Sequence, residues 1–236
     1  MKFFETSKYN SFKKSTYISL RWIGIAGQLI AVNFVYYILN FEFNWLFSNI
    51  TIFFGILSNL YLTLIYKKTQ LSDRSAFIFL VIDISQLSIL IYLTGGVANP
   101  FVIFLLIPSV FSSSNLSFVT NSLLVFLTTL AIVFLTFFST DLPGPIGDHF
   151  HVSPYYYYAI PVSLIIALFF LNFFAMTFGT QSRLRKEALA KMEEVMATEH
   201  ELLSLGGQAA AAAHSLGTPL STIKIITQDL IKQFKG

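Results

Sequence analysis

The sequence predicts an all-α fold: a polytopic membrane protein of six transmembrane helices, followed by a cytoplasmic coiled-coil/dimerisation helix. Three observations support this class. Hydrophobic residues make up 55% of the chain and charged residues only 11%, whereas an average soluble domain has about 25% charged residues. Long apolar stretches alternate with short polar loops, as membrane-spanning helices require. The composition then changes abruptly after Phe178, where a charged helical pattern begins.

The six spans follow from the lengths of the apolar stretches, because a helix needs about 20 residues to cross a bilayer. The apolar region 101–138 is too long for one helix, and the polar run 112–115 is its natural break. We therefore divide this region into a short fourth span and a fifth span. The expected spans are 17–39, 45–66, 76–94, 101–114, 118–138 and 155–178.

Basic residues predict the side of the membrane on which each loop lies. All 15 Lys and Arg residues fall near the N-terminus, between the second and third spans, or after the sixth. Arg21 is grouped with the N-terminal lysines. The other three loops contain no basic residue and only Glu42, Asp141 and Asp148 as acidic ones. By the positive-inside rule both termini are cytoplasmic and these loops face outward.

Two polar residues lie inside the third span. Asp83 is at its middle, and Gln86 follows three residues later on the same helical face. A carboxyl group at this depth costs a few kcal/mol unless it is protonated or paired. It is explained either by a proton-coupled element or by a polar clasp with Asn33, Asn59 or another bundle residue. The clasp is the favoured interpretation.

The region after the sixth span has a heptad pattern. Apolar or small residues recur in steps of four and three, with Glu199 and Gly206 as weak points. This spacing predicts a parallel homodimer that continues from the last membrane helix. The seam consists of Ala188, Met192, Val195, Glu199, Leu202, Gly206, Ala209, Ala213, Leu216, Leu220, Ile223, Thr227, Leu230 and Phe234.

The stretch 209–220 is organised around one histidine. His214 follows a run of alanines, which favour helix, and flanks the predicted seam, so it points toward solvent. Pro219 lacks a backbone donor and is expected to bend the helix one turn beyond the histidine. Small neighbours leave room for a bulky partner at the imidazole, as a histidine that attacks a phosphoryl group requires.

The turn between the third and fourth spans is the second informative stretch. Gly95 and Gly96 permit positive φ, Asn99 and Pro100 favour a turn, and Phe101 begins the next span. Any tight hairpin between membrane helices favours such residues. An amide, free backbone N–H groups and an aromatic ring near the lipid surface are also suited to binding a quinone.

Together these stretches resemble sensor histidine kinases of the redox-responsive RegB/PrrB type. The stretch around His214 is similar to the family's HELGTPL phosphoacceptor motif, and 95–101 matches its GGxxNPF signature. The resemblance implies a multi-pass protein of the bacterial inner membrane that senses ubiquinone through Gly95, Gly96, Asn99, Pro100 and Phe101. It implies autophosphorylation of His214 from ATP and phosphotransfer to a response regulator. The expected domains are an N-terminal segment (1–16), a sensor domain (17–179), a signalling helix (180–205) and the first helix of the dimerisation and phosphotransfer domain (206–236).

Two departures from the family pattern are visible. Ser215 stands where the family has an acidic residue that acts as a base, while Thr218 retains the hydroxyl that positions water for phosphatase activity. We therefore expect slower autophosphorylation and impaired phosphatase activity. No nucleotide-binding motif appears before Gly236, so ATP would act only through a domain outside this sequence, and we expect the chain to be a truncated product or a fragment.

Two other functions are compatible with parts of the sequence. A non-catalytic regulator that dimerises with a complete kinase fits Ser215, and a small transporter would use Asp83 and Gln86 along its path, although no broken helices or repeat halves are visible. The chain has no cysteine, and the loop histidines His149 and His151 are most simply solvated, so no metal site is expected. No basic helix interleaved with aromatics suggests nucleic-acid binding.

Overall fold

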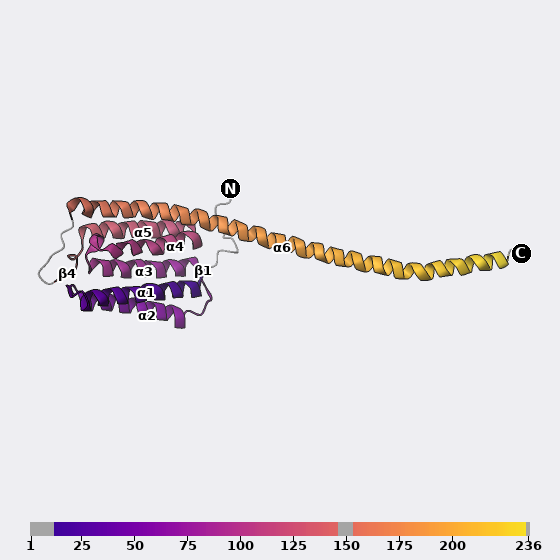
Figure 1. Cartoon of the computed structure of the whole chain (residues 1–236), viewed down its shortest axis with the longest axis horizontal. Helices are drawn as coiled ribbons and strands as arrows, with labels where there is room; N and C mark the ends of the chain where they lie inside the picture. Colours follow the sequence, from indigo (N-terminus) through magenta and orange to yellow (C-terminus); the bar gives the residue numbers. More distant parts are fainter. Residues whose placement is uncertain (1–11, 146–152, 235–236) are drawn as a thin grey trace. The chain divides into compact units, whose positions relative to one another are not determined.

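The computed structural model describes residues 12–145 and 153–234, which fall into two units, Met1–Gln181 and Ser182–Gly236 (Figure 1). Nearly all of the secondary structure is helical, which confirms the predicted all-α class. The helices are α1 (Lys14–Tyr37), α2 (Trp45–Leu64), α3 (Asp73–Tyr92), η1 (Gly96–Ala98), η2 (Pro100–Leu106), α4 (Ile107–Asn115), α5 (Phe118–Phe137) and α6 (Pro154–Gln233). Four two-residue strands are β1 (Phe12–Lys13), β2 (Phe41–Glu42), β3 (Gln70–Leu71) and β4 (Gly144–Pro145).

Five of the described helices, α1, α2, α3, α5 and α6, are long and apolar enough to cross a membrane. A shorter apolar element, Pro100–Asn115, stands at the predicted fourth span. The first and third helices begin three residues earlier than predicted, at Lys14 and Asp73. In α3 the Ser72 hydroxyl accepts the Ser75 N–H, as expected of a helix N-cap.

The fourth span is short, and its backbone geometry compensates for this. Seven of its sixteen residues, Pro100–Leu106, form a 3₁₀ helix before α4 begins at Ile107. A 3₁₀ helix rises about 2.0 Å per residue, against about 1.5 Å in an α-helix. The element therefore reaches about 27 Å, close to the roughly 30 Å hydrocarbon thickness of a bilayer.

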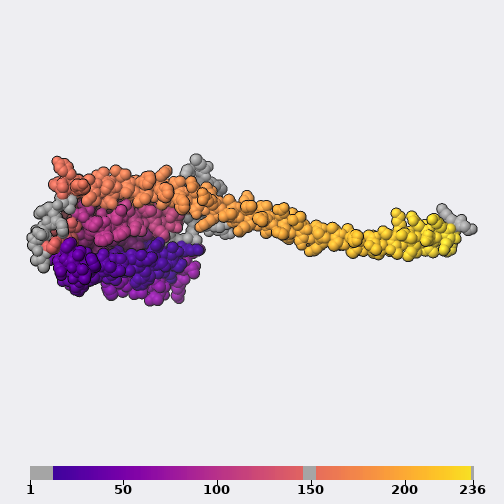
Figure 2. All heavy atoms as spheres, viewed as in Figure 1, coloured from indigo at the N-terminus to yellow at the C-terminus, as the bar shows by residue number. Residues whose placement is uncertain are grey.

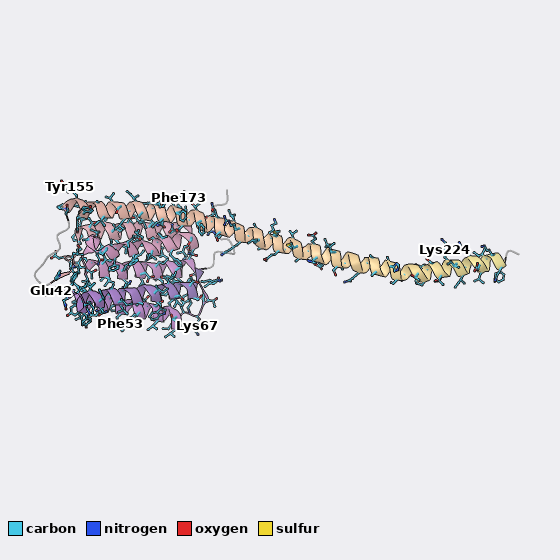
Figure 3. All side chains as sticks on the ribbon, viewed as in Figure 1. Glu42, Phe53, Lys67, Tyr155, Phe173 and Lys224 are labelled. Carbon is cyan, nitrogen blue, oxygen red and sulfur yellow. The ribbon has the colours of Figure 1, made fainter. Side chains whose placement is uncertain are left out.

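The main core of unit 1 lies between α3, η2, α5 and the first part of α6, and a smaller cluster joins α1, α2 and α3. The central side chains of the main core, among them Leu80, Leu105, Leu124 and Leu168, are at most 1% exposed. Figure 2 shows the helices of this unit packed closely over one face. Outward-facing residues are largely apolar, and the labelled Phe53 and Phe173 project from the bundle (Figure 3), as expected for a surface in contact with lipid.

Hydroxyl and amide groups join α4 to α5 inside this core. The Ser109 and Thr128 hydroxyls are 2.5 Å apart, and the Ser112 hydroxyl donates to Asn121 Oδ1 at 2.5 Å. Buried polar groups in lipid require such partners. These bonds fix the register of the short α4 against α5.

The two ends of unit 1 are closed by small strand pairs and caps. β1 pairs with β3 at one end, and β2 pairs with β4 at the other (Figure 1). At the β1 end, the Asp73 carboxylate accepts the Ser117 N–H at 3.0 Å and the hydroxyls of Ser117 and Thr120. Asp73 thus begins α3 and also holds Ser117, the N-cap residue of α5. Lys67 lies at the β1 end, whereas Glu42 and Tyr155 lie at the opposite end (Figure 3).

Helix α6 packs in unit 1 through one stripe of buried residues: Pro161, Leu164, Leu168, Asn172 and Gly179. A Cβ on Gly179 would lie 3.0 Å from the Ser114 Cα, so this glycine allows α6 to approach the end of α4 closely. Near the other end, the Tyr157 hydroxyl donates to the Thr136 carbonyl at 2.8 Å. In unit 2 the described residues form the rest of this helix, and their apolar side chains are exposed.

Candidate functional site

The turn after α3 has the tight geometry that its glycines allow. Gly95 and Gly96 have φ of +108° and +57°, which are backbone conformations that residues other than glycine rarely adopt. Neither glycine has space for a side chain. A Cβ on Gly95 would lie 2.9 Å from the Leu142 Cα, and one on Gly96 would lie 2.8 Å from the Leu135 carbonyl oxygen. The turn is therefore packed directly against the end of α5 and the segment that follows it.

The Asn99 side chain is committed to the turn. Its Nδ2 donates to the Thr94 carbonyl at 2.9 Å and to the Thr94 hydroxyl at 2.7 Å. Its Oδ1 accepts the Phe101 N–H at 2.8 Å, which caps η2. With both amide hydrogens used and the residue only 9% exposed, Asn99 shapes the turn and has no free donor to offer to a quinone carbonyl.

The residues just beyond Asn99 are accessible from outside the bundle. Phe101 and Phe104 are 45% and 47% exposed, and their rings stack with centroids 5.9 Å apart. Pro100 beside them is also exposed. This surface can stack on a flat aromatic ligand that arrives through the lipid.

Substitution of Gly96 by alanine is expected to destabilise unit 1 by about 2 kcal/mol or more, because the backbone has φ +57° and the new methyl meets the Leu135 carbonyl. Thermal unfolding in detergent measures this. Gly24→Ala is the matched control, because a Cβ at Gly24 meets nothing within 4 Å in an α-helix, where alanine is favoured over glycine. Equal melting temperatures for the two variants would contradict the role assigned to Gly96.

Asp83 is clasped by α1, through residues other than the expected Asn33 and Asn59. Arg21 donates to its Oδ1 from Nε at 2.9 Å and lies 2.6 Å from it through Nη2, while the Tyr17 hydroxyl donates to Oδ2 at 2.5 Å. The Arg21 and Asp83 side chains are only 6% and 20% exposed. Arg21 Nη2 also donates to the Ser58 hydroxyl of α2 at 2.9 Å, so the cluster joins three helices.

The sequence-based interpretation of Arg21 as a residue of the cytoplasmic edge was wrong, because the side chain lies two turns inside α1 and is buried. The signal was present in the sequence, since Arg21 falls within the predicted span 17–39. Two charges of opposite sign inside predicted spans are natural partners. Counting basic residues by loop concealed this pair.

Gln86 and Asn33 make separate contacts along α1. Gln86 Nε2 donates to Gln28 Oε1 at 2.9 Å. Asn33 Oδ1 accepts the Trp45 indole N–H at 2.9 Å, and its Nδ2 donates to Asn49 Oδ1 at 3.2 Å. Together with Arg21, these bonds hold α1 at three levels along its length.

The predicted phosphoacceptor lies on the exposed surface of α6. His214 is exposed, and α6 continues through Pro219 without interruption. The Ser215 hydroxyl donates to the Ala212 carbonyl at 2.9 Å, and the Thr218 hydroxyl donates to the His214 carbonyl at 3.5 Å. Both hydroxyls thus point to their own helix, while the imidazole is accessible to a partner.

Metal ligands are not clustered in the described ranges 12–145 and 153–234, where no three His, Cys, Asp or Glu residues come together. His149 and His151 lie outside these ranges.

A family described as the PilS-like transmembrane domain matches residues 26–190. Two curated relatives, both named sensor histidine kinase RegB and both from Cereibacter sphaeroides, are 29% identical to this chain over 219 residues. The match covers 92% of this chain and 47% of each relative, so the chain spans about half the length of these relatives. No solved structure matches it. The expected resemblance to RegB-type sensors is thus confirmed, and the chain belongs to the family of PilS-like transmembrane domains.

Proposed function

We propose that this chain is the membrane-sensing and phosphoacceptor part of a two-component sensor histidine kinase. The observation that carries the proposal is the similarity to RegB over 219 of 236 residues. A match of this length extends from the membrane helices into the helix that bears His214. The proposal has two parts: phosphorylation of His214 and detection of ubiquinone at the turn 95–101.

The first part rests on the accessibility of His214. An imidazole on an exposed helix flanked by alanines can receive a phosphoryl group from a docked ATP-binding domain and pass it to the aspartate of a response regulator. Ser215 donates its hydroxyl hydrogen to the Ala212 carbonyl and is no base at neutral pH. The histidine therefore lacks the neighbouring carboxylate of the family motif, and its phosphorylation is slow.

Dimerisation belongs to the same proposal. The apolar stripe of unit 2 is exposed, with Met192, Leu202, Leu216 and Ile223 each more than 60% accessible. A second copy of the chain in parallel register buries this stripe as a coiled-coil seam.

The orientation in the membrane follows from charge. Lys13, Lys14, Lys67 and Lys68 belong to the β1 end of unit 1, and Glu42 belongs to the opposite end. Tyr36 and Trp45, which stack with centroids 5.1 Å apart, lie toward the Glu42 end and suit a membrane interface. We place the β1 end and both termini in the cytoplasm of a bacterium, with unit 1 in the inner membrane.

The second part, quinone sensing, uses the exposed rings beside the turn. Phe101 and Phe104 offer a stacking surface at the lipid boundary, and Asn99 with the two glycines fixes the backbone that presents it. The quinone is a regulatory ligand in this proposal, and its redox state biases phosphorylation.

The double variant Phe101→Ala/Phe104→Ala is expected to lose most of the ubiquinone that co-purifies from quinone-containing membranes, because the stacking surface is removed. Ubiquinone is extracted and quantified per mole of protein. The matched control is Phe126→Ala, an exposed phenylalanine of α5 that is 63% accessible. Equal retention by the double variant and the control refutes the site. Asn99→Ala is less informative, because it also removes the hydrogen bonds that form the turn.

A further inference from the structure

The contact between α1 and α2 holds an unmatched donor and an unmatched acceptor. Arg21 uses Nε and Nη2 for Asp83 and Ser58, but its buried Nη1 has no hydrogen-bond partner in the described part of the chain. On the facing α2, Asn59 is 0% exposed, and its Oδ1 has no partner among the same residues. Asn59 Nδ2 donates to the Ile18 carbonyl, one turn before Arg21. The two atoms therefore lie at a similar level of one helix pair.

Buried polar atoms without partners are rare and raise the free energy of a fold. Here the two atoms are complementary, since Nη1 can only donate and Oδ1 can only accept. A small slide of α1 along α2 can pair them. The bond that holds Asn59 to Ile18 in the present position is long, at 3.4 Å, and opposes such a slide only weakly.

Other bonds of α1 favour the present position. Gln28 accepts from Gln86 at 2.9 Å, and Asn33 accepts from Trp45 at 2.9 Å. These two bonds tie α1 to α3 and α2 and oppose a slide of α1. The present position satisfies them and leaves Arg21 Nη1 and Asn59 Oδ1 without hydrogen-bond partners among the described residues. On the outer face of α1, no other described part of the chain restrains the helix at Gly24 and Gly27, because a Cβ at either position would meet nothing within 4 Å.

We propose that α1 has two stable positions against α2 and α3, and that Arg21 selects between them. In the first, Arg21 Nη2 donates to Ser58, as described above. In the second, α1 has slid by about 1–2 Å, the scale of helix shifts in switching proteins. Arg21 Nη1 then donates to Asn59 Oδ1 and releases Ser58. Asp83 is the ionic partner in both positions and acts as the pivot.

The chain carries a native reporter for this movement. Trp45 Nε1 donates to Asn33 of α1, and the chain has only two tryptophans, so the indole N–H spectrum of the full chain in nanodiscs is simple. Trp22→Phe assigns the Trp45 signal. Ser58→Ala removes a bond of the first position. Asn59→Leu removes the bond of the second position, together with the long contact from Asn59 Nδ2 to the Ile18 carbonyl, which opposes the slide only weakly. We expect the two variants to move the Trp45 signal, or the ratio of its two components, in opposite directions, with a population ratio changed at least threefold.

Ser88→Ala is the matched control, because its hydroxyl donates only to the Ile84 carbonyl of its own helix, and it should leave the Trp45 signal in place. Opposite shifts distinguish the switch from a purely structural cluster, in which both variants loosen the same contact. A Trp45 signal that is single in the parent and unmoved by either variant overturns the proposal. So do shifts of both variants in the same direction. A variant that fails to fold is replaced by Ser58→Cys or Asn59→Val, which are judged by the same criterion.

Discussion

Replacement of His214 by glutamine is expected to abolish acid-labile phosphorylation of this protein. The imidazole is the proposed nucleophile, and it is exposed on α6. Glutamine retains the length and polarity of the side chain and favours helix, so the fold should be preserved. The measurement is incorporation of radiolabelled phosphate from ATP into membranes that contain the native gene product, followed by its loss in acid and retention in base.

Ser215→Glu provides the second arm of this experiment. A glutamate next to His214 supplies the carboxylate base that Ser215 does not provide, and general-base assistance typically contributes about 10²-fold or more to such a step. The initial rate of phosphorylation should therefore rise strongly. Equal rates for Ser215→Glu and the parent contradict the role assigned to this position.

The same assay separates the proposed kinase from the alternative regulator. When a complete partner kinase is added, phosphate that appears on His214 only in its presence indicates a receiver that acts in trans. Phosphate that appears without a partner indicates that the native product carries its own ATP-binding domain. Phosphate retained by His214→Gln places the acceptor on another residue and removes the phosphoacceptor part of the proposal.

Much of the membrane fold could be predicted from the length of apolar stretches alone. The second and fifth spans begin at Trp45 and Phe118, where predicted. In each case a polar residue, Asn44 or Ser117, ends the preceding loop directly before the apolar run. The fourth span was harder to judge, since sixteen residues are too few for a full α-helical crossing. The 3₁₀ segment that begins at Pro100 lengthens this span. The spacing of apolar residues in the sequence does not reveal such a change in rise per residue.

The candidate sites show a different limit of sequence reasoning. The residue type of Gly95 and Gly96 permits positive φ. Whether Asn99 points outward or into its own turn depends on Thr94, five residues before it. An amide in a turn has several partners within reach, and only the three-dimensional path of the chain selects among them. Arg21 was missed for a different reason. Counting basic residues by loop grouped it with the N-terminal lysines, although Arg21 and its partner Asp83, 62 residues away, both lie inside predicted spans.

Removal of either charge of the Arg21–Asp83 pair is expected to destabilise unit 1 by about 3–5 kcal/mol, because an unpaired charge is left buried. Arg21→Met and Asp83→Leu test this separately, by unfolding of the full chain in detergent. Replacement of both residues by apolar side chains removes both charges together and often restores stability. The double variant Arg21→Met/Asp83→Leu should therefore recover most of the loss.

The recovery is the decisive observation, since loss of stability in a single variant also follows from poor packing. Asp73→Asn is a useful comparison, because it alters a carboxylate that accepts hydrogen bonds from Ser117 and Thr120 at the start of α5. This carboxylate has no basic partner to leave unpaired among the described residues. It should cost less than either single variant of the buried pair. If the losses of Arg21→Met and Asp83→Leu simply add in the double variant, the two side chains act independently. Arg21 would then not be held by Asp83, and the pivot of the proposed α1 movement would be lost with it.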